Sequence, residues 1–99
     1  MNKTKRILLV TRHQGALDWL KSQGIEGEHI PHFKMDDFNN GDTVIGTLPV
    51  NFIAKICKKK GKYIHLSMNI PAEKRGKELT VDDMINCGIK LQEYHVTIV

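Results

Sequence analysis

The sequence predicts an α/β fold, a single domain over residues 1–99 with a mainly parallel sheet of about five strands flanked by about three helices. Three observations support this prediction. Short apolar runs alternate with stretches of helical period, which indicates strand–helix–strand units. The run Ile7-Leu8-Leu9-Val10 is apolar without interruption, as in a strand buried on both faces. The composition, 40% hydrophobic and 26% charged over 99 residues, suits one domain with a modest core.

The first half of the chain predicts a buried strand, a short helix, an edge strand and a second buried strand. We expect them at residues 6–11, 15–23, 28–33 and 43–46. Gly24 suits the end of the helix, because glycine readily adopts the left-handed conformation that closes helices. Pro31 has no N–H group, which places the third element at an edge of the sheet. Residues 36–42 are polar and contain Asn39-Asn40-Gly41-Asp42, which predicts a turn.

The second half predicts a helix, a strand, another helix and a last strand. Pro49 suits the first turn of the first helix, Gly61 ends it, and a strand follows at residues 62–67. Thr80 and Asp83 have the spacing of a capping box that opens the next helix. Positions of helical period continue that helix at Val81, Met84, Ile85, Gly88 and Leu91. The β-rich stretch from Tyr94 to Val99 predicts the last strand.

Polar residues follow three of these strands. Right-handed crossovers bring the carboxyl ends of parallel strands to one edge of the sheet, where open α/β sheets bind ligands. We therefore expect three segments to meet in one crevice: Thr11-Arg12-His13, Gly46-Thr47-Leu48-Pro49 and Ser67-Met68-Asn69. The crevice is the candidate functional site.

The first of these segments has the chemistry of an anion site. An arginine can grip phosphate oxygens with two hydrogen bonds, and an imidazole can move a proton near neutral pH. Gly15 lets the backbone approach a phosphate at the start of the helix, where free N–H groups favour negative charge. The alternative interpretation makes Arg12 a surface residue and His13 a polar residue at a helix start.

Other polar residues have two interpretations each. Thr47 either donates to a ligand or caps the helix, and Asn51 either contacts the ligand or only adds polarity to the first helical turn. Trp19 is expected in the core or at an interface, with stacking on a base as the alternative. His65 lies inside a strand and is expected as a buried, hydrogen-bonded core residue, with a catalytic role as the less favoured alternative. The charged segment from Pro71 to Glu78 either closes over a ligand or is solvated surface.

The net charge of +4 favours an anionic partner. Part of it comes from the run Lys58-Lys59-Lys60-Gly61-Lys62, which equally suits a solvated helix end. Cys57 and Cys87 lie inside predicted helices and are expected as small core residues. The longest apolar run has four residues, and the basic segment Met1–Arg6 lacks the apolar core of a signal peptide. We therefore expect a cytoplasmic protein with no membrane partner.

No cofactor and no metal ion are expected. The glycines do not form a dinucleotide-binding fingerprint or a phosphate-binding P-loop. The candidate metal ligands are His29, His32, Asp36 and Asp37, but the two histidines would point to opposite faces of a strand.

Four blocks of sequence together resemble a known family. They are Val10–Leu20, Gly41–Asn51, Tyr63–Ser67 and Pro71–Leu79. In this order and spacing they resemble a small family of CRISPR-associated proteins encoded beside type III CRISPR systems. The resemblance implies a Rossmann-like domain related to the cyclic-oligoadenylate sensor (CARF) domains. It also implies a ring nuclease, which degrades cyclic tetra-adenylate and switches the antiviral response off.

The physical interpretation of the crevice agrees with that role. A ring of phosphates and adenines has rotational symmetry, which a two-fold homodimer can match. Cleavage needs no metal if the neighbouring 2′-hydroxyl attacks in line, giving linear di-adenylates that end in a 2′,3′-cyclic phosphate. Arg12 would stabilise charge on phosphorus and His13 would transfer a proton. The predicted ligand-binding residues are Thr11, Gly15, Gly46, Thr47, Asn51, Ser67, Asn69 and Arg75.

Other functions remain open. The same crevice would serve a non-catalytic module that binds or sequesters the cyclic nucleotide. A general binder of single-stranded RNA is less favoured, because only 6% of the residues are aromatic and no RNA-recognition motif is present. A metal-dependent hydrolase is least favoured, because acidic residues do not cluster at the strand ends. No DNA partner is expected.

Overall fold

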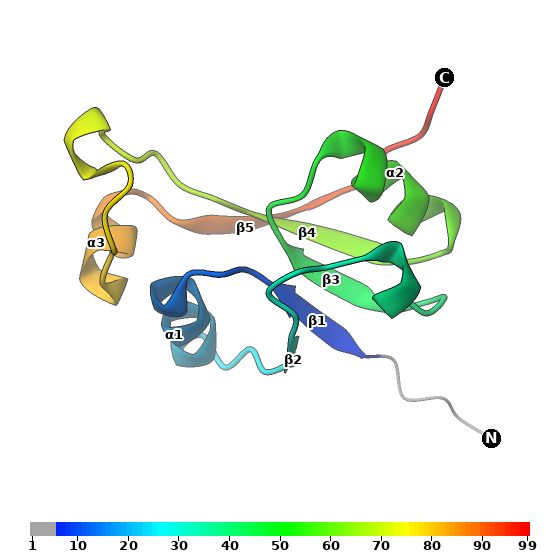
Figure 1. Ribbon diagram of the computed structural model, residues 1–99, viewed down its shortest axis with the longest axis horizontal. Coiled ribbons are helices and arrows are strands. Elements are labelled where there is room, and N and C mark those ends of the chain that lie inside the picture. The colour runs from blue at the N-terminus through cyan, green and yellow to red at the C-terminus, as the bar shows by residue number, and fades with distance from the viewer. Residues whose placement is uncertain (1–5) are drawn as a thin grey trace.

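Residues 6–99, which the computed structural model describes, form a five-stranded sheet with helices on both faces (Figure 1). The predicted α/β class is therefore confirmed. Of the basic segment Met1–Arg6, only Arg6 lies within the described residues. The strands are β1 (Ile7–Val10), β2 (Glu28–His29), β3 (Thr43–Gly46), β4 (Lys62–Ser67) and β5 (Lys90–Tyr94). The helices are α1 (Gln14–Ser22), α2 (Val50–Lys58) and α3 (Val81–Asn86), with 3₁₀ turns at Met35–Asp37 and Ala72–Lys74.

The strand order places a topological switch point between β1 and β3. The order is β2-β1-β3-β4-β5, with β1 to β4 parallel and β5 antiparallel to β4. From β1 the chain crosses through α1 to β2 on one side, and from β3 it crosses through α2 to β4 on the other. Right-handed crossovers in opposite directions put α1 and α2 on opposite faces of the sheet. A crevice opens where the carboxyl ends of β1 and β3 diverge.

Each face of the sheet has its own apolar core. On one face, Leu9, Ile45 and Leu66 pack against α1 and α3. On the other face, α2 covers the sheet, and the buried cluster there contains Leu8, Val10, Phe38, Val44, Ile53, Ile56 and Tyr63. Trp19 is 8% exposed in the first core, as predicted for a core residue.

The last third of the chain differs from the prediction. The helix predicted to continue to Leu91 ends at Asn86, because Gly88 takes a left-handed φ of 72° and Ile89 N donates back to the Met84 carbonyl. The chain is thereby free to form β5 at Lys90–Tyr94, and the strand predicted from Tyr94 to Val99 is wrong. Cys87 accordingly caps α3 instead of lying inside it.

The predicted edge strand is also shorter than expected. The strand predicted at 28–33 is reduced to Glu28–His29, because Ile30 N makes the last ladder bond to the Leu9 carbonyl and Pro31 has no N–H to continue. Its place at the edge of the sheet is confirmed. The capping box of Thr80 and Asp83 is present, and Gly24 has the predicted left-handed φ, at 78°.

An ion pair between the partly exposed Arg6 and the buried Asp42 fastens the start of β1 to the start of β3. Asp42 is 3% exposed and accepts from the Arg6 guanidinium at 2.8 and 3.2 Å, and from Asn39 N at 3.0 Å. Burial of Asp42 opposes ionisation, but these hydrogen bonds outweigh it and hold the pKa of the carboxyl below its ordinary value of 3.8. The predicted polar turn therefore contains a structural anchor.

Substitution of Asp42 tests this anchor. Asp42→Asn is expected to lower the free energy of unfolding by about 2–3 kcal/mol at neutral pH, because it removes the buried carboxylate that accepts two hydrogen bonds from Arg6 and leaves only Glu28, at 3.6 Å, as a charged partner. The pKa of Asp42 is lower in the folded state than its ordinary value of 3.8. The stabilisation by the Asp42 carboxylate is therefore complete above pH 3.8 and is lost as the pH falls through the folded-state pKa. Urea unfolding of both proteins should therefore show a gap that closes on acidification. An equal gap at every pH would contradict the account.

Candidate functional site

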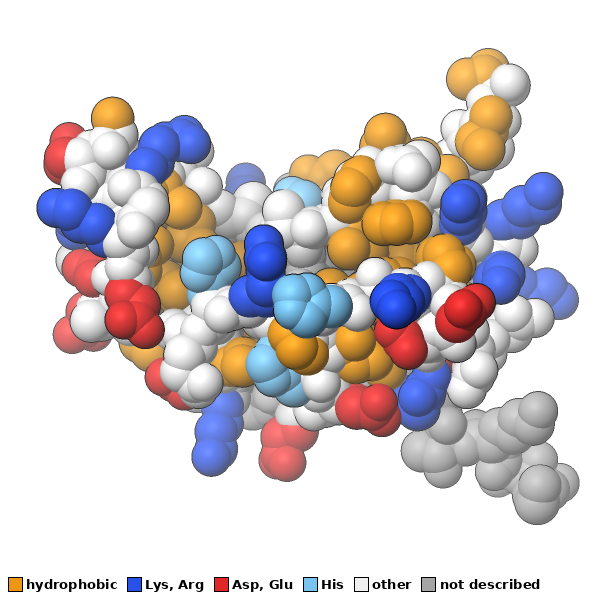
Figure 2. All heavy atoms as spheres, viewed as in Figure 1, with side chains coloured by type: hydrophobic (Ala, Val, Ile, Leu, Met, Phe, Trp, Pro, Cys, Tyr) orange, Lys and Arg blue, Asp and Glu red, His pale blue; other side chains and the backbone are white. Residues whose placement is uncertain are grey.

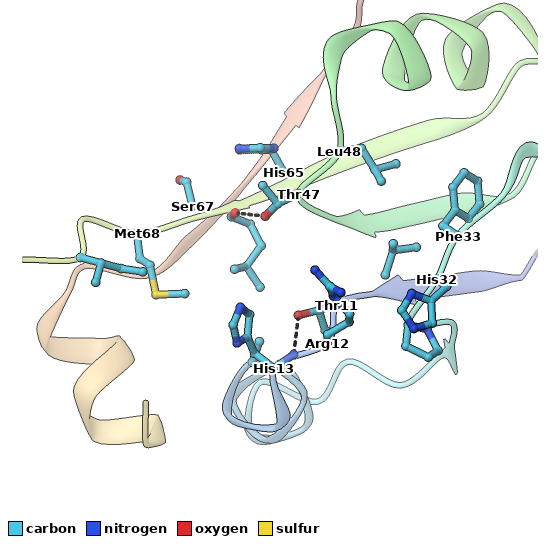
Figure 3. Close-up of a pocket in the computed structure, with 15 residues that line it drawn as sticks. Thr11, Arg12, His13, His32, Phe33, Thr47, Leu48, His65, Ser67 and Met68 are labelled. Carbon is cyan, nitrogen blue, oxygen red and sulfur yellow. Dashed lines mark hydrogen bonds between the residues drawn. The ribbon is translucent and has the colours of Figure 1, made fainter. Parts of the chain in front are cut away.

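A cavity of about 670 Å³ lies at the switch point (Figure 3). It is lined by the ends of β1, β3 and β4 and by the segment after β2, at residues 10–13, 16, 31–33, 47–48, 65–68 and 70. Segments that are far apart in the sequence thus meet at the carboxyl edge of the parallel strands. Five predicted site residues line this cavity: Thr11, Arg12, His13, Thr47 and Ser67.

The loop from β1 to α1 is held by two hydrogen bonds. His13 N donates to Thr11 Oγ1 at 3.2 Å, and His13 then precedes the first turn of α1. His29, on the neighbouring strand β2, has Nε2 2.6 Å from the Thr11 carbonyl oxygen. A carbonyl cannot donate, so this nitrogen carries the proton. The loop that presents Arg12 is therefore tied to the edge of the sheet.

Thr47 joins the ends of β3 and β4. Its hydroxyl donates to the Leu66 carbonyl at 3.0 Å. The hydroxyl hydrogen is thus already used, and the oxygen offers its lone pairs to a donor in the cavity. The alternative role of helix cap does not apply, because α2 begins after Pro49 without a side-chain cap.

The electrostatics of the cavity favour an anion. Among residues 6–99, its lining contains one arginine and three histidines, Arg12, His13, His32 and His65, and no carboxylate. In Figure 2, histidine side chains gather beside a basic group near the middle of the face shown. Arg12 is exposed and forms no salt bridge with any described residue. Its guanidinium is therefore available to a ligand.

Two helix N-termini at this edge are also left open. Neither α1 nor α2 has a side-chain cap or an acidic residue in its first turn. By contrast, α3, which does not line the cavity, has a full capping box and two aspartates in its first turn. Uncapped N–H groups and the helix dipole stabilise a negative charge. The two helices that begin at the cavity thus add to the attraction of Arg12 for an anion.

Tyr63 and His65 form a hydrogen-bonded pair, which confirms the hydrogen bond expected of His65 and identifies a partner that the sequence did not predict. The Tyr63 side chain is fully buried, and its hydroxyl oxygen lies 2.9 Å from Leu48 N, 3.0 Å from the Gly46 carbonyl oxygen and 2.8 Å from His65 Nδ1. Burial raises the pKa of Tyr63, which keeps the phenol protonated. His65 is half-buried and lines the cavity, so its expected place in the core is wrong.

The remaining predicted site residues lie outside this cavity. A Cβ on Gly15 would collide with the Leu79 carbonyl and the Met84 side chain, and one on Gly46 would collide with the Val10 carbonyl. These two glycines therefore allow close packing of α1 on the segment before α3 and of β3 on β1. Asn51 is exposed in the first turn of α2, and Asn69 N donates to the Cys87 carbonyl at 2.8 Å.

Arg75 lines a second pocket, of about 430 Å³, that shares His13, Met68 and Ile70 with the first. Lys74 and Lys77 add positive charge to it and Glu78 adds one negative charge, while Lys74 also pairs with Asp83 at 3.3 Å. The two pockets together form a groove along the carboxyl edge of the sheet. By contrast, Lys58, Lys59 and Lys60 are exposed at the turn before β4, at the opposite end of the strand.

No group of three or more His, Cys, Asp or Glu side chains between residues 6 and 99 is arranged to hold a metal ion, including the set around His29 and Asp36. Cys57 and Cys87 are free thiols. No helix in the same range is long and apolar enough to cross a membrane.

Comparison with known proteins identifies a family. The model of the family described as "Putative CRISPR-associated protein (Cas_VVA1548)" matches residues 8–97, which include every strand end that forms the cavity. No curated protein and no solved structure matches significantly. Because the match covers nearly the whole chain, the protein belongs to the Cas_VVA1548 family of CRISPR-associated proteins.

Proposed function

We propose that this protein is a ring nuclease that binds cyclic tetra-adenylate and cleaves it without a metal ion. The observation that carries the proposal is the cavity at the switch point, with two uncapped helix N-termini, an Arg12 that pairs with no described residue, and no carboxylate among the described residues that line it. This is the chemistry of a phosphodiester site. Membership of a CRISPR-associated family and the resemblance of the four sequence blocks support the choice of ligand.

The size of the site supports a homodimer on one ring. A cavity of about 670 Å³ is in the range that holds one small ligand, and the adjoining pocket adds about 430 Å³. A ring of four nucleotides has symmetry-related halves, and one groove presents only one set of these residues. Two copies related by a two-fold axis would present two equivalent grooves to opposite halves of the ring. Arg75 and Ser67 would then contact nucleotides on either side of the scissile phosphate.

The reaction is an internal transfer at phosphorus. The 2′-oxygen attacks the adjacent phosphorus, the P–O5′ bond breaks, and the products carry a 2′,3′-cyclic phosphate and a free 5′-hydroxyl. Arg12 and the N–H groups at the start of α1 stabilise the extra negative charge on the phosphoryl oxygens. His13 exchanges a proton with a reacting oxygen. Thr11 and Thr47 hold the phosphate in line.

Incubation of the protein with labelled cyclic tetra-adenylate and EDTA tests the proposal. A ring nuclease converts the ring to linear products under single-turnover conditions. A sequestering module binds the ring and releases it intact, which would refute the catalytic role. Equal competition by linear oligoadenylate would instead indicate a general binder of single-stranded RNA.

A further inference from the structure

The pair Tyr63–His65 fixes where the proton of His65 lies. The phenol has one hydrogen and makes three contacts, to Leu48 N, the Gly46 carbonyl oxygen and His65 Nδ1. Leu48 N can only donate and the carbonyl can only accept. All three contacts are satisfied together only if the phenol donates to Gly46 and accepts from both Leu48 N–H and an Nδ1–H of His65. The neutral imidazole then has an unprotonated Nε2.

That second nitrogen is accessible. No described residue forms a hydrogen bond with Nε2 of His65. Every buried side-chain nitrogen or oxygen in residues 6–99 has a hydrogen-bond partner, so Nε2, which has none, is not buried. Tyr94, on β5, contacts the ring of His65 edge-on with centroids 5.7 Å apart, which together with Tyr63 limits the ring's orientation.

His13 and His65 approach the cavity from different sides. In Figure 3, His13 stands at the start of α1 and His65 projects from the other side of β4, with Thr47 between them. An in-line displacement requires proton-transfer groups on two sides of the phosphorus, because the entering and leaving oxygens lie on opposite sides of it. One group must remove a proton from the entering oxygen while another supplies a proton to the leaving oxygen.

We propose that His65 is the general base of the ring-cleaving reaction and that Tyr63 is its positioning residue, an assignment that rests on the proposed function. Nε2 of His65 takes the proton of the 2′-hydroxyl as O2′ forms its bond to phosphorus. The P–O5′ bond breaks, its electron pair goes to O5′, and O5′ takes a proton from the His13 imidazolium. His65 ends protonated and His13 neutral, and exchange with water restores both.

His65→Asn removes the proposed base, Nε2, and keeps a donor for the hydrogen bond to Tyr63. The amide N–H₂ of His65→Asn can replace Nδ1–H as a donor to Tyr63 while Nε2 is lost. We expect the single-turnover cleavage rate to fall by roughly 10²–10⁴-fold with ring affinity and melting temperature little changed. His95→Asn, the same change at an exposed histidine outside the cavity, is the matched control and should cleave at the wild-type rate.

A ring with a 5′-bridging sulfur at the scissile linkages distinguishes base from acid. A thiolate leaves without protonation, so this ring should restore fast cleavage to His13→Ala and not to His65→Asn. Tyr63→Phe should cause a smaller loss that disappears in the His65→Asn background, because the tyrosine acts through the histidine. If the sulfur ring instead rescues His65→Asn, or if His65→Asn cleaves the ordinary ring normally, the assignment is wrong and the ring nuclease stands. If the wild type cleaves neither ring, the proposed function itself fails.

Discussion

Arg12→Ala is expected to lower the single-turnover rate of ring cleavage by about 10²–10³-fold, the usual cost of removing one group that stabilises developing charge. Arg12 is exposed at the cavity and has no carboxylate partner among the described residues, so its removal leaves no buried charge and no lost salt bridge. The fold should therefore survive the substitution, with a melting temperature close to that of the wild type.

Two further variants make the Arg12 result specific. Arg12→Lys keeps the charge and loses the two-pronged geometry, so it should recover only part of the rate. Lys59→Ala removes one positive charge at the opposite end of the strands and should leave cleavage unchanged. Equal losses in Lys59→Ala and Arg12→Ala would mean that net charge, and not the cavity, attracts the ring. Cleavage by Arg12→Ala at the wild-type rate would remove Arg12 from the site.

The second large effect is expected at His13. His13→Ala should slow the chemical step by roughly 10²–10⁴-fold, because proton transfer by a placed side chain contributes about that much. The side chain is exposed and makes no side-chain hydrogen bond to the rest of the described structure, so folding should be unaffected. Ring affinity should change little, since the proposal assigns phosphate binding to Arg12, Thr11, Thr47 and the backbone.

The measurement for His13 separates binding from chemistry. The dissociation constant of the ring is determined for His13→Ala alongside the single-turnover rate at saturating protein, with His95→Ala as the matched control. A loss confined to affinity would show that His13 only holds the ring. An unchanged rate and affinity together would contradict any role for it.

The sequence was sufficient to predict the main strands and helices and to predict that the strand ends meet at one edge of the sheet. Unbroken apolar runs such as Ile7–Val10 predict buried parallel strands, and the carboxyl ends of such strands must share an edge. That rule alone brought Arg12, Thr47 and Ser67 to one cavity. The capping box at Thr80 could equally be predicted from the sequence, because its two partners are only three residues apart.

The predictions from sequence are wrong where tertiary contacts determine the local structure. Residues 95–99 have high β-propensity, but β5 forms at Lys90–Tyr94 because α3 closes early at Gly88 and the following segment pairs with β4. Gly15 was interpreted as a phosphate contact, whereas its missing side chain makes room for the Leu79 carbonyl. Gly88 has the same local signal as Gly24, but apolar positions of helical period on both sides of it favour a longer helix. The neighbour of Gly15, 64 positions along the chain, has no local signal.

His65 was missed for a different reason. Its strand reads as core, and a histidine there is normally a satisfied core residue. A signal was nevertheless present, because strand alternation puts His65 on the same face as Ser67 and Tyr63, two residues from the strand end. Which of those side chains reach past the end of α2 into the cavity depends on the length and position of that helix.

Cleavage of the ring by its own 2′-hydroxyl is tested by the mass of the first products. These are formed from cyclic tetra-adenylate in oxygen-18 water with EDTA, under single-turnover conditions. Attack by the 2′-hydroxyl involves no water, so the account predicts linear di-adenylates ending in a 2′,3′-cyclic phosphate without oxygen-18. An intact ring, or a first-formed terminal phosphate that contains oxygen-18, would contradict it.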